Sequence, residues 1–461
     1  MSNQIFKNRE LEINKDNIFA NDVLDRKEAI EDLSSLIENT SSPLVMSVNA
    51  SWGAGKTTFV KMWQAYLEKE KDIRSIYFSA WEDDFSNDPL ISILGELERY
   101  ISKEESLSES VKNQALELVK TGGKIVLKTL PTVLKSLTAG IVDKEPLNNI
   151  LQTFVENAGN ELVETYQQNK DLTNQFKETL QGIIENIGKA KQLVIFIDEL
   201  DRCRPLYAIE LLERIKHFFD IDGIVFVLSI DKAQLSETIK SQYGNIDTDN
   251  YLRRFIDLEY NLSNPSLDRF CDFLYTKIFN INQIIKHKSI DTSSDNLIIK
   301  YLIIENRLSL REAEQFYLRL SIIYKSIQQA ISPIHTTLIP MLLILKLKFE
   351  DLYKELLDGK EIAEKIIETV ASSRVAQLHN SYLDTMKLYI KAIVFVLSKS
   401  DGVLEDERAR FNKNKEEIAS EDFQIYDIAF YNYCGYNYRL KQAVNTIIKI
   451  IELQDRFNFD L

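Results

Sequence analysis

The chain has 461 residues and a formal net charge of −14, and hydrophobic and charged residues make up 44% and 27% of it. These values are ordinary for a globular protein of more than one structural unit, and the acidic balance argues against nucleic-acid binding over the whole surface. Three widely spaced cysteines and four histidines argue against a disulfide framework and a histidine-rich metal centre.

The first residues contain no apolar segment typical of a signal peptide. No charge-free apolar run reaches the roughly 18–20 residues that a membrane span needs. The nearest candidate, Lys124–Val142, is interrupted by lysines and by Pro131, and fits an amphipathic helical hairpin better. We therefore expect a cytoplasmic protein with reduced cysteines and no membrane span.

The first predicted helix opens near Asn21 or Asp22 and runs to about Asn39, with an apolar stripe along one face. A helix in this place could contact a nucleotide base, or it could serve packing alone.

The segment Leu44–Val60 is the first strong functional signal. An apolar run, Leu44–Val48, predicts a buried strand, and two glycines then precede Lys56, Thr57 and a helical pattern. Strand, glycine-rich turn and helix form a phosphate cradle, because backbone N–H groups and the positive helix end face the phosphates.

Within this cradle we expect Lys56 to contact the β- and γ-phosphates and the Thr57 hydroxyl to ligate Mg²⁺. Ala50 stands where the G-x-x-x-x-G-K-[ST] pattern has its first glycine. The remaining cradle is intact, and its predicted nucleotide-binding residues are Ser51, Trp52, Gly53, Ala54, Gly55, Lys56, Thr57 and Thr58.

A second strand is predicted at Arg74–Ala80, and a helix at Pro89–Ile101, where proline suits the first turn. Residues 102–190 are polar with leucine, isoleucine and valine at helical spacing. This stretch is too long for a loop, so we expect an inserted helical region, used for a partner or for stability alone.

The next signal is an apolar run that ends in Asp198 and Glu199. It predicts a buried parallel strand that delivers acids to its carboxyl edge. Asp198 would hold Mg²⁺ through water, and Glu199 would polarise the attacking water as general base. Asp201 competes for that role, and Glu199 and Asp201 could instead cap a helix.

A further buried strand, Gly223–Ile230, is followed by a helix near Ala233. We expect this strand to lie between the cradle strand and the Asp198 strand. Ser229 and Asp231 at its end could sense the γ-phosphate, or they could cap the helix. A short strand is expected at Ile256–Tyr260.

Beyond Pro265 the pattern is helical, and Pro333 and Pro340 predict breaks. Charge stabilisation at the γ-phosphate needs a cation, in cis or from a neighbouring subunit. The candidates are Arg202, Arg204, Arg253, Arg254 and Arg311.

Four motifs together carry a family resemblance: W-G-x-G-K-[ST] at Trp52–Thr57, F-S-A-W-E at Phe78–Glu82, D-E-L-D-R-C at Asp198–Cys203 and Y-L-R-R-F at Tyr251–Phe255. Over roughly residues 20–330 the chain resembles the KAP P-loop NTPases, the family named for the Kidins/ARMS and Pif proteins.

The resemblance implies an additional-strand catalytic-Glu ATPase with a long insertion between its two nucleotide motifs. Many members carry membrane helices there, whereas the matching segment here is too charged to cross a bilayer. Ser309-Leu310-Arg311-Glu312 resembles the family's helical-lid motif and makes Arg311 the favoured sensor. Bacterial relatives are often linked to phage exclusion beside separately encoded effectors.

We therefore predict an α/β P-loop NTPase core with a helical insertion and an all-α C-terminal region. The expected divisions are two core halves at 1–101 and 191–262, an insertion at 102–190, a helical lid at 263–345 and a C-terminal region at 346–461.

The expected function is Mg²⁺-dependent ATP hydrolysis coupled to a conformational change or assembly that regulates a partner, in anti-phage defence on the family resemblance. The predicted catalytic residues are Glu199, Lys56 and Arg311, and the predicted Mg²⁺ ligands are Thr57 and Asp198. One alternative is a nucleotide-binding scaffold that hydrolyses little and recruits an effector. Another is a nucleic-acid-stimulated motor, which the net charge does not support. We expect a homo-oligomer and a protein effector encoded nearby; the trigger and the choice of ATP or GTP stay open.

Overall fold

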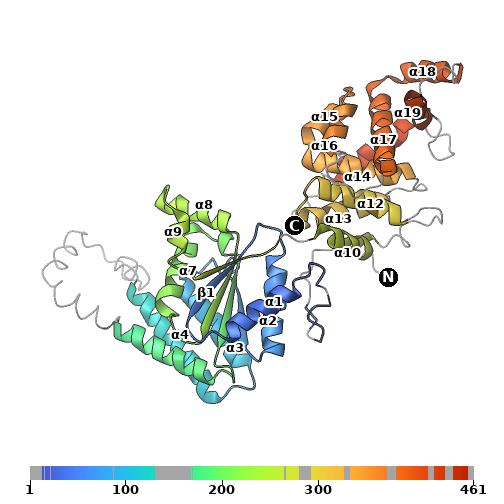
Figure 1. Ribbon diagram of the computed structural model, residues 1–461. Coiled ribbons are helices and arrows are strands. Elements are labelled where there is room, and N and C mark those ends of the chain that lie inside the picture. The colour runs from blue at the N-terminus through green and yellow to red at the C-terminus, as the bar shows by residue number, and fades with distance from the viewer. Residues whose placement is uncertain are drawn as a thin grey trace, which may run out of the picture. The chain divides into compact units, whose positions relative to one another are not determined.

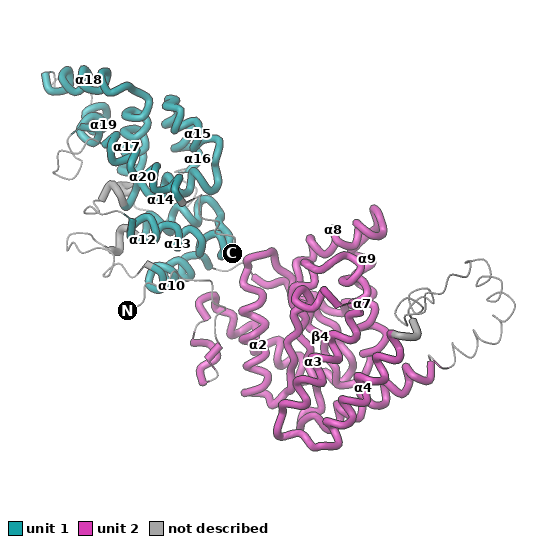
Figure 2. The backbone as a smooth tube through the Cα atoms, turned by 180° about the vertical axis from the view of Figure 1, so that it is seen from behind, with its two compact units in different colours: residues 1–9, 265–461 teal, residues 10–264 magenta. Residues whose placement is uncertain are grey.

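The computed structural model describes residues 13–129, 168–263, 266–279, 292–326, 333–370, 380–413, 420–430 and 440–454, apart from residues 15, 21, 87 and 169. The chain divides into two compact units, residues 10–264 and residues 265–461. The first unit contains a sheet with helices on both faces, and the second is helical in its described residues (Figures 1 and 2).

Five parallel strands form the sheet of the first unit in the order β2-β3-β4-β1-β5. Their bounds are β1 (Leu44–Asn49), β2 (Arg74–Ser79), β3 (Leu193–Asp198), β4 (Ile224–Ile230) and β5 (Leu258–Asn261). β3 and β4 are buried along their whole length, as expected of central parallel strands covered on both faces. β4 lies between β1 and β3, as predicted.

Side chains alternate between the two faces of the sheet. Val194 and Phe196 on β3 share a core with α1 (Lys27–Glu38) and α2 (Lys56–Glu70). Ile195 and Ile197 face the opposite layer. That layer contains α3 (Pro89–Lys103), α4 (Glu109–Thr129), the helical residues 170–186, α7 (Pro205–Phe218) and α8 (Lys232–Tyr243).

The first helix begins later than predicted. α1 starts at Lys27, yet the Asp22 carboxylate accepts the backbone N–H groups of Arg26 and Lys27, each at 2.9 Å. Asp22 therefore satisfies donors at the helix start from a position outside the helix. In the predicted insertion, α4 and residues 170–186 are helical, whereas most of the expected hairpin lies outside the described residues.

Asn49, the last residue of β1, connects three elements. Its backbone oxygen accepts the Leu262 N–H at 2.9 Å, and its side-chain amide donates to Asn261 Oδ1 at 2.9 Å. Its Oδ1 accepts the N–H of Lys232, the first residue of α8, at 3.0 Å. The end of the cradle strand is thus hydrogen bonded to the end of the first unit and to α8.

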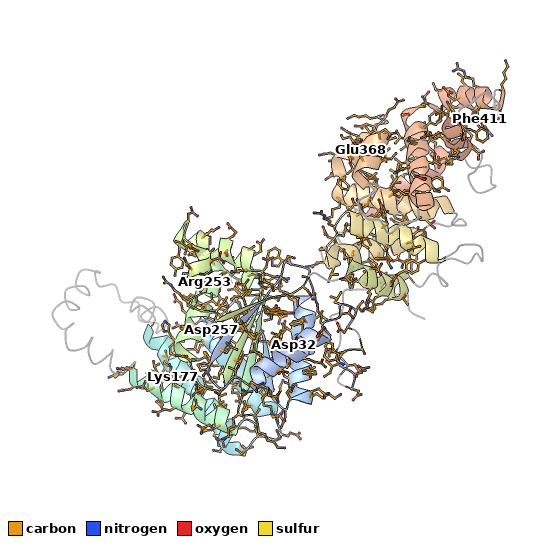
Figure 3. The ribbon with its side chains drawn as sticks, viewed as in Figure 1. Asp32, Lys177, Arg253, Asp257, Glu368 and Phe411 are labelled. Atoms are coloured by element: carbon orange, nitrogen blue, oxygen red, sulfur yellow. The ribbon has the colours of Figure 1, made fainter. Side chains whose placement is uncertain are left out.

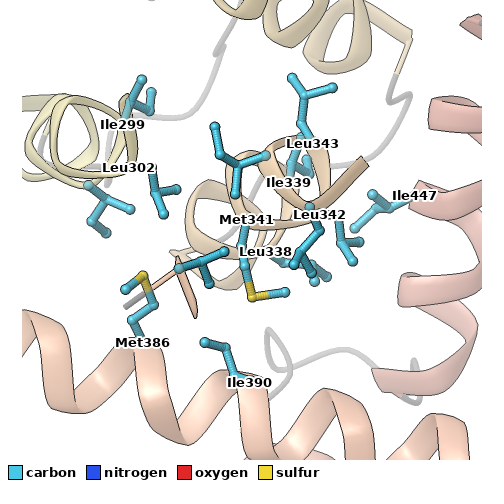
Figure 4. Packing of buried hydrophobic residues seen from close by; sticks show 14 of the residues in the cluster. Ile299, Leu302, Leu338, Ile339, Met341, Leu342, Leu343, Met386, Ile390 and Ile447 are labelled. Atoms are coloured by element: carbon cyan, nitrogen blue, oxygen red, sulfur yellow. The ribbon is translucent and has the colours of Figure 1, made fainter. Parts of the chain in front are cut away.

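The second unit is organised around α14 (Pro333–Lys348), whose side chains at Leu338, Ile339 and 341–345 are all buried. Residues of α12 (Thr292–Glu305), α17 (Asn380–Ser398) and α20 (Leu440–Gln454) surround it (Figure 4). The remaining helices are α10 (Leu267–Phe279), α13 (Leu310–Ser326), α15 (Glu350–Leu357), α16 (Ala363–Val370), α18 (Asp401–Lys413) and α19 (Ser420–Phe430).

The predicted break at Pro340 is wrong, because Pro340 lies inside α14. An interior proline costs a helix about 3 kcal/mol. This helix is apolar on every side and packed on every side, so burial outweighs that cost. Pro333, in contrast, is the first residue of α14. Among the described residues, no helix combines the length and apolarity needed to cross a bilayer.

Candidate nucleotide site

The loop between β1 and α2 has the conformation of an anion cradle. Gly53 and Gly55 have φ angles of 80° and 85°, in the left-handed region that favours glycine. Gly55 is the N-cap of α2, and the described residues provide no side-chain cap for this helix. These donors and the positive end of the helix dipole are therefore available to an anion. All the predicted cradle residues, Ser51 to Thr58, lie in this loop and the first turn of α2.

Lys56 is folded back onto the loop. Its Nζ donates to the backbone oxygen of Ala50 at 2.7 Å and to that of Ser51 at 3.3 Å, and the residue is 9% exposed. Burial lowers the pKa of Lys56, while the nearby carboxylates of Asp201, Asp231 and Asp198 act in the opposite direction.

The two nucleotide motifs meet at Thr57 and Asp198. The Thr57 hydroxyl donates to Asp198 Oδ2 at 2.7 Å, across 141 residues of sequence. Tyr77 on β2 donates to the same oxygen at 3.1 Å, and Asp198 Oδ1 accepts the Glu199 N–H at 2.9 Å. Asp198 is 1% exposed, so these contacts fix a buried carboxylate beside the start of α2.

Ser229 is the register partner of Asp198 on β4, so both side chains leave the same face of the sheet. Ser229 Oγ is buried and has no hydrogen-bond partner among the residues that the structure describes. Hydroxyl and carboxylate oxygens are the donors that Mg²⁺ prefers, and in nucleotide sites one or two of them suffice beside phosphates. Thr57 and Asp198 therefore fit Mg²⁺, and the unsatisfied Ser229 hydroxyl adds a polar atom on the same face.

Glu199 has φ 63° and ψ 23°, a left-handed conformation uncommon for a residue with a side chain. Ser79 Oγ donates to Glu199 Oε2 at 3.0 Å, and Arg202 Nη1 lies 2.5 Å from Glu199 Oε1. The η1 helix (Leu200–Arg202) follows directly. Glu199 makes no side-chain cap to this helix, so the capping alternative does not describe it.

Asp201, the competing acid, is 6% exposed. Its Oδ2 accepts a hydrogen bond from the indole N–H of Trp52, and its Oδ1 is buried and finds no partner within the described ranges. Asp201 thus anchors the half-exposed Trp52 ring of the cradle. Asp231 is the N-cap of α8, because its side chain accepts the backbone N–H groups of Ala233 and Gln234. Its Oδ2 also accepts the backbone N–H of Trp52 at 3.2 Å. Asp231 therefore both caps α8 and forms a hydrogen bond with the cradle.

The five candidate arginines lie in different environments. Arg202 pairs with Glu199, and Arg204 binds the Asp84 carboxylate at 2.9 Å. Arg253 and Arg254 follow α9 (Thr248–Leu252) and are exposed. Figure 3 shows where Arg253 lies. Arg311 lies on α13 of the second unit, and its role as a sensor stays a prediction.

The motif around Arg311 has a clear local use. The Ser309 N–H donates to Glu312 Oε2 at 2.7 Å, and the Glu312 N–H donates to Ser309 Oγ at 3.3 Å. This reciprocal pair is a capping box at the start of α13.

Sequence reasoning missed three contacts of the site: Tyr77 with Asp198, Ser79 with Glu199, and the Trp52 indole with Asp201. The one available signal was that F-S-A-W-E begins in the last residues of a predicted strand, which brings Ser79 to the same sheet edge as Glu199.

Comparison with known proteins gives a family match. The KAP family P-loop domain matches residues 26–327. The uncharacterized protein MJ0182 of Methanocaldococcus jannaschii is 30% identical over 177 residues, which cover 34% of this chain and 89% of that protein.

Two solved structures are similar at lower identity. The ORC2 protein of Aeropyrum pernix in its ADP form has 11% identity and a TM-score of 0.36, over 98% of this chain and 97% of that chain. PCH-2 of C. elegans has 13% identity and a TM-score of 0.33, over 71% and 69%. On the match of its own residues 26–327, this chain belongs to the KAP family of P-loop NTPases.

Proposed function

We propose that this chain hydrolyses ATP in a Mg²⁺-dependent reaction and that the nucleotide state controls its conformation or assembly. The observation that carries the proposal is the 2.7 Å hydrogen bond between Thr57 and Asp198, because it joins the hydroxyl that would ligate Mg²⁺ to the carboxylate that would hold Mg²⁺ through water. When bound, Mg²⁺ would neutralise charge on the β- and γ-phosphates.

The chain's own residues divide the remaining work. Backbone N–H groups from Gly53 to Thr58 hold the phosphates. Lys56 exchanges the carbonyl oxygens of Ala50 and Ser51 for phosphate oxygens, which bear more negative charge. Glu199 orients the attacking water and accepts its proton.

Matched variants test the proposal. Lys56→Ala should abolish nucleotide binding. Glu199→Gln should bind ATP like the wild type and release phosphate at least roughly 100-fold more slowly, since a general base contributes about 10²–10⁴-fold. Binding and phosphate release are measured with ATP and GTP, each with Mg²⁺ and with excess EDTA. Equal, near-zero phosphate release from the wild type and Glu199→Gln, with binding retained, would refute hydrolysis and favour the scaffold alternative.

Control of a protein effector and a role in anti-phage defence are proposed on the family resemblance. Homo-oligomerisation belongs to the same proposal. Light scattering of the Glu199→Gln variant with and without Mg·ATP tests assembly, because this variant should trap the bound state. An unchanged mass with and without Mg·ATP would reject nucleotide-driven assembly. The rate of phosphate release with and without DNA tests the motor alternative.

A further inference from the structure

Both carboxylate oxygens of Glu199 already have partners. Oε2 accepts from Ser79 at 3.0 Å, and Oε1 lies 2.5 Å from the guanidinium of Arg202. The side chains of Glu199 and Arg202 are 19% and 35% exposed, so this ion pair is shielded more than an ordinary surface pair. A general base needs an oxygen that points to the attacking water.

Arg202 is held from its other side by an aromatic ring. Its guanidinium carbon lies 5.9 Å from the ring centroid of Trp81, within the range of a cation–π interaction. Trp81 follows β2 and is 52% exposed. The loop that carries it is tied to the start of α7, because Arg204 donates to both carboxylate oxygens of Asp84 at 2.8 and 2.9 Å.

These contacts form a short chain from the surface to the candidate base: Trp81, Arg202, Glu199. We propose that Arg202 is a positioning residue that restrains Glu199 in a resting orientation, and that Trp81 keeps Arg202 in place. This inference rests on the proposed hydrolysis, since it concerns the same carboxylate. Hydrolysis then includes a step in which the Arg202–Glu199 pair opens, and the rate of phosphate release depends on how firmly that pair is held.

Steady-state phosphate release tests the restraint. Arg202→Ala should raise kcat at least threefold and change KM less than twofold, because the cradle is untouched. Arg202→Lys keeps the charge and should stay near the wild-type rate. Trp81→Ala should raise kcat by less than Arg202→Ala, and Trp81→Phe, which keeps a ring, should not. Arg202→Ala combined with Glu199→Gln should be as slow as Glu199→Gln alone.

A tenfold or greater fall in kcat for Arg202→Ala, with its unfolding midpoint retained, would overturn the restraint and give Arg202 a direct role in the reaction. An unchanged kcat in Arg202→Ala would also overturn it.

A second measurement does not depend on hydrolysis. Urea unfolding midpoints are compared for Arg202→Ala, Glu199→Gln and the double variant, without nucleotide. The two single shifts should not add, because the residues are in contact. Additive shifts would overturn the restraint even in a chain that hydrolyses ATP. Non-additive shifts with no phosphate release from any variant would support the restraint and refute the proposed hydrolysis alone.

Discussion

Two substitutions in the phosphate-binding loop, Ala50→Gly and Gly55→Ala, test whether its backbone conformation sets stability and nucleotide affinity. Ala50 is not among the described non-glycine residues with positive φ, whereas Gly55 has φ 85° and ψ 22°. Ala50→Gly should lower the free energy of unfolding by about 0.4–1 kcal/mol, through the added freedom of the unfolded chain. Gly55→Ala should lower it by about 1–2 kcal/mol, because a side chain in the left-handed region is strained.

The two variants should differ in nucleotide affinity as well. The backbone oxygen of Ala50 contacts Lys56 and its N–H donates to the Ile230 oxygen, and glycine keeps both groups. Ala50→Gly should therefore change Kd by less than about twofold. Where the free loop of Gly55→Ala relaxes instead, the same strain of about 1–2 kcal/mol is paid on binding in place of lost stability and weakens binding roughly 5- to 30-fold.

Urea unfolding followed by tryptophan emission measures the first unit alone, since all three tryptophans, Trp52, Trp63 and Trp81, belong to it. Titration with a fluorescent ATP analogue gives Kd. A tenfold gain in affinity from Ala50→Gly would refute the reasoning and mean that the natural loop is impaired. So would Gly55→Ala with wild-type stability and affinity.

Three further predictions use matched or internal controls. Ser229→Ala and Ser47→Ala each remove a buried hydroxyl that has no partner in the described part of the chain, so both should leave stability unchanged or raised. Only Ser229→Ala should slow phosphate release, because Ser229 shares its sheet face with α2, and equal rates would contradict a role for Ser229. Asp231→Ala and Asp247→Ala each remove a helix cap and should lower the free energy of unfolding by about 0.5–2 kcal/mol, and only the former should weaken ATP binding in the same titration. Burial raises the pKa of the Cys203 thiol, so iodoacetamide should label it at least roughly tenfold faster in urea than in the native chain, measured by mass spectrometry; equal labelling would contradict its burial.

The strands could be predicted because each carries its own signal, and of their order the place of β4 between β1 and β3 was predicted as well. The apolar runs before Asp198 and Asp231 are long, and both end in acids at the carboxyl edge of parallel strands. Local rules also worked at Pro89, which occupies the first turn of α3.

The contacts within the site could not be predicted in the same way. Ser79 and Glu199 are 120 residues apart, and Trp52 and Asp201 are 149 apart. Such pairs depend on side-chain directions at the sheet edge, which local patterns do not determine. The predicted helix break at Pro340 is wrong because tertiary packing around α14 overrides the local preference of proline.

The hydrogen bonds of Asn49 connect the end of the cradle strand to two distant parts of the first unit. Along the covalent chain, Asn49 and Asn261 are 212 residues apart, yet one side-chain amide joins them. A displacement of the end of β1 would therefore be passed on to Asn261 and Leu262, at the end of the first unit. It would also reach the start of α8 through the N–H of Lys232, so one side-chain amide would distribute it in two directions.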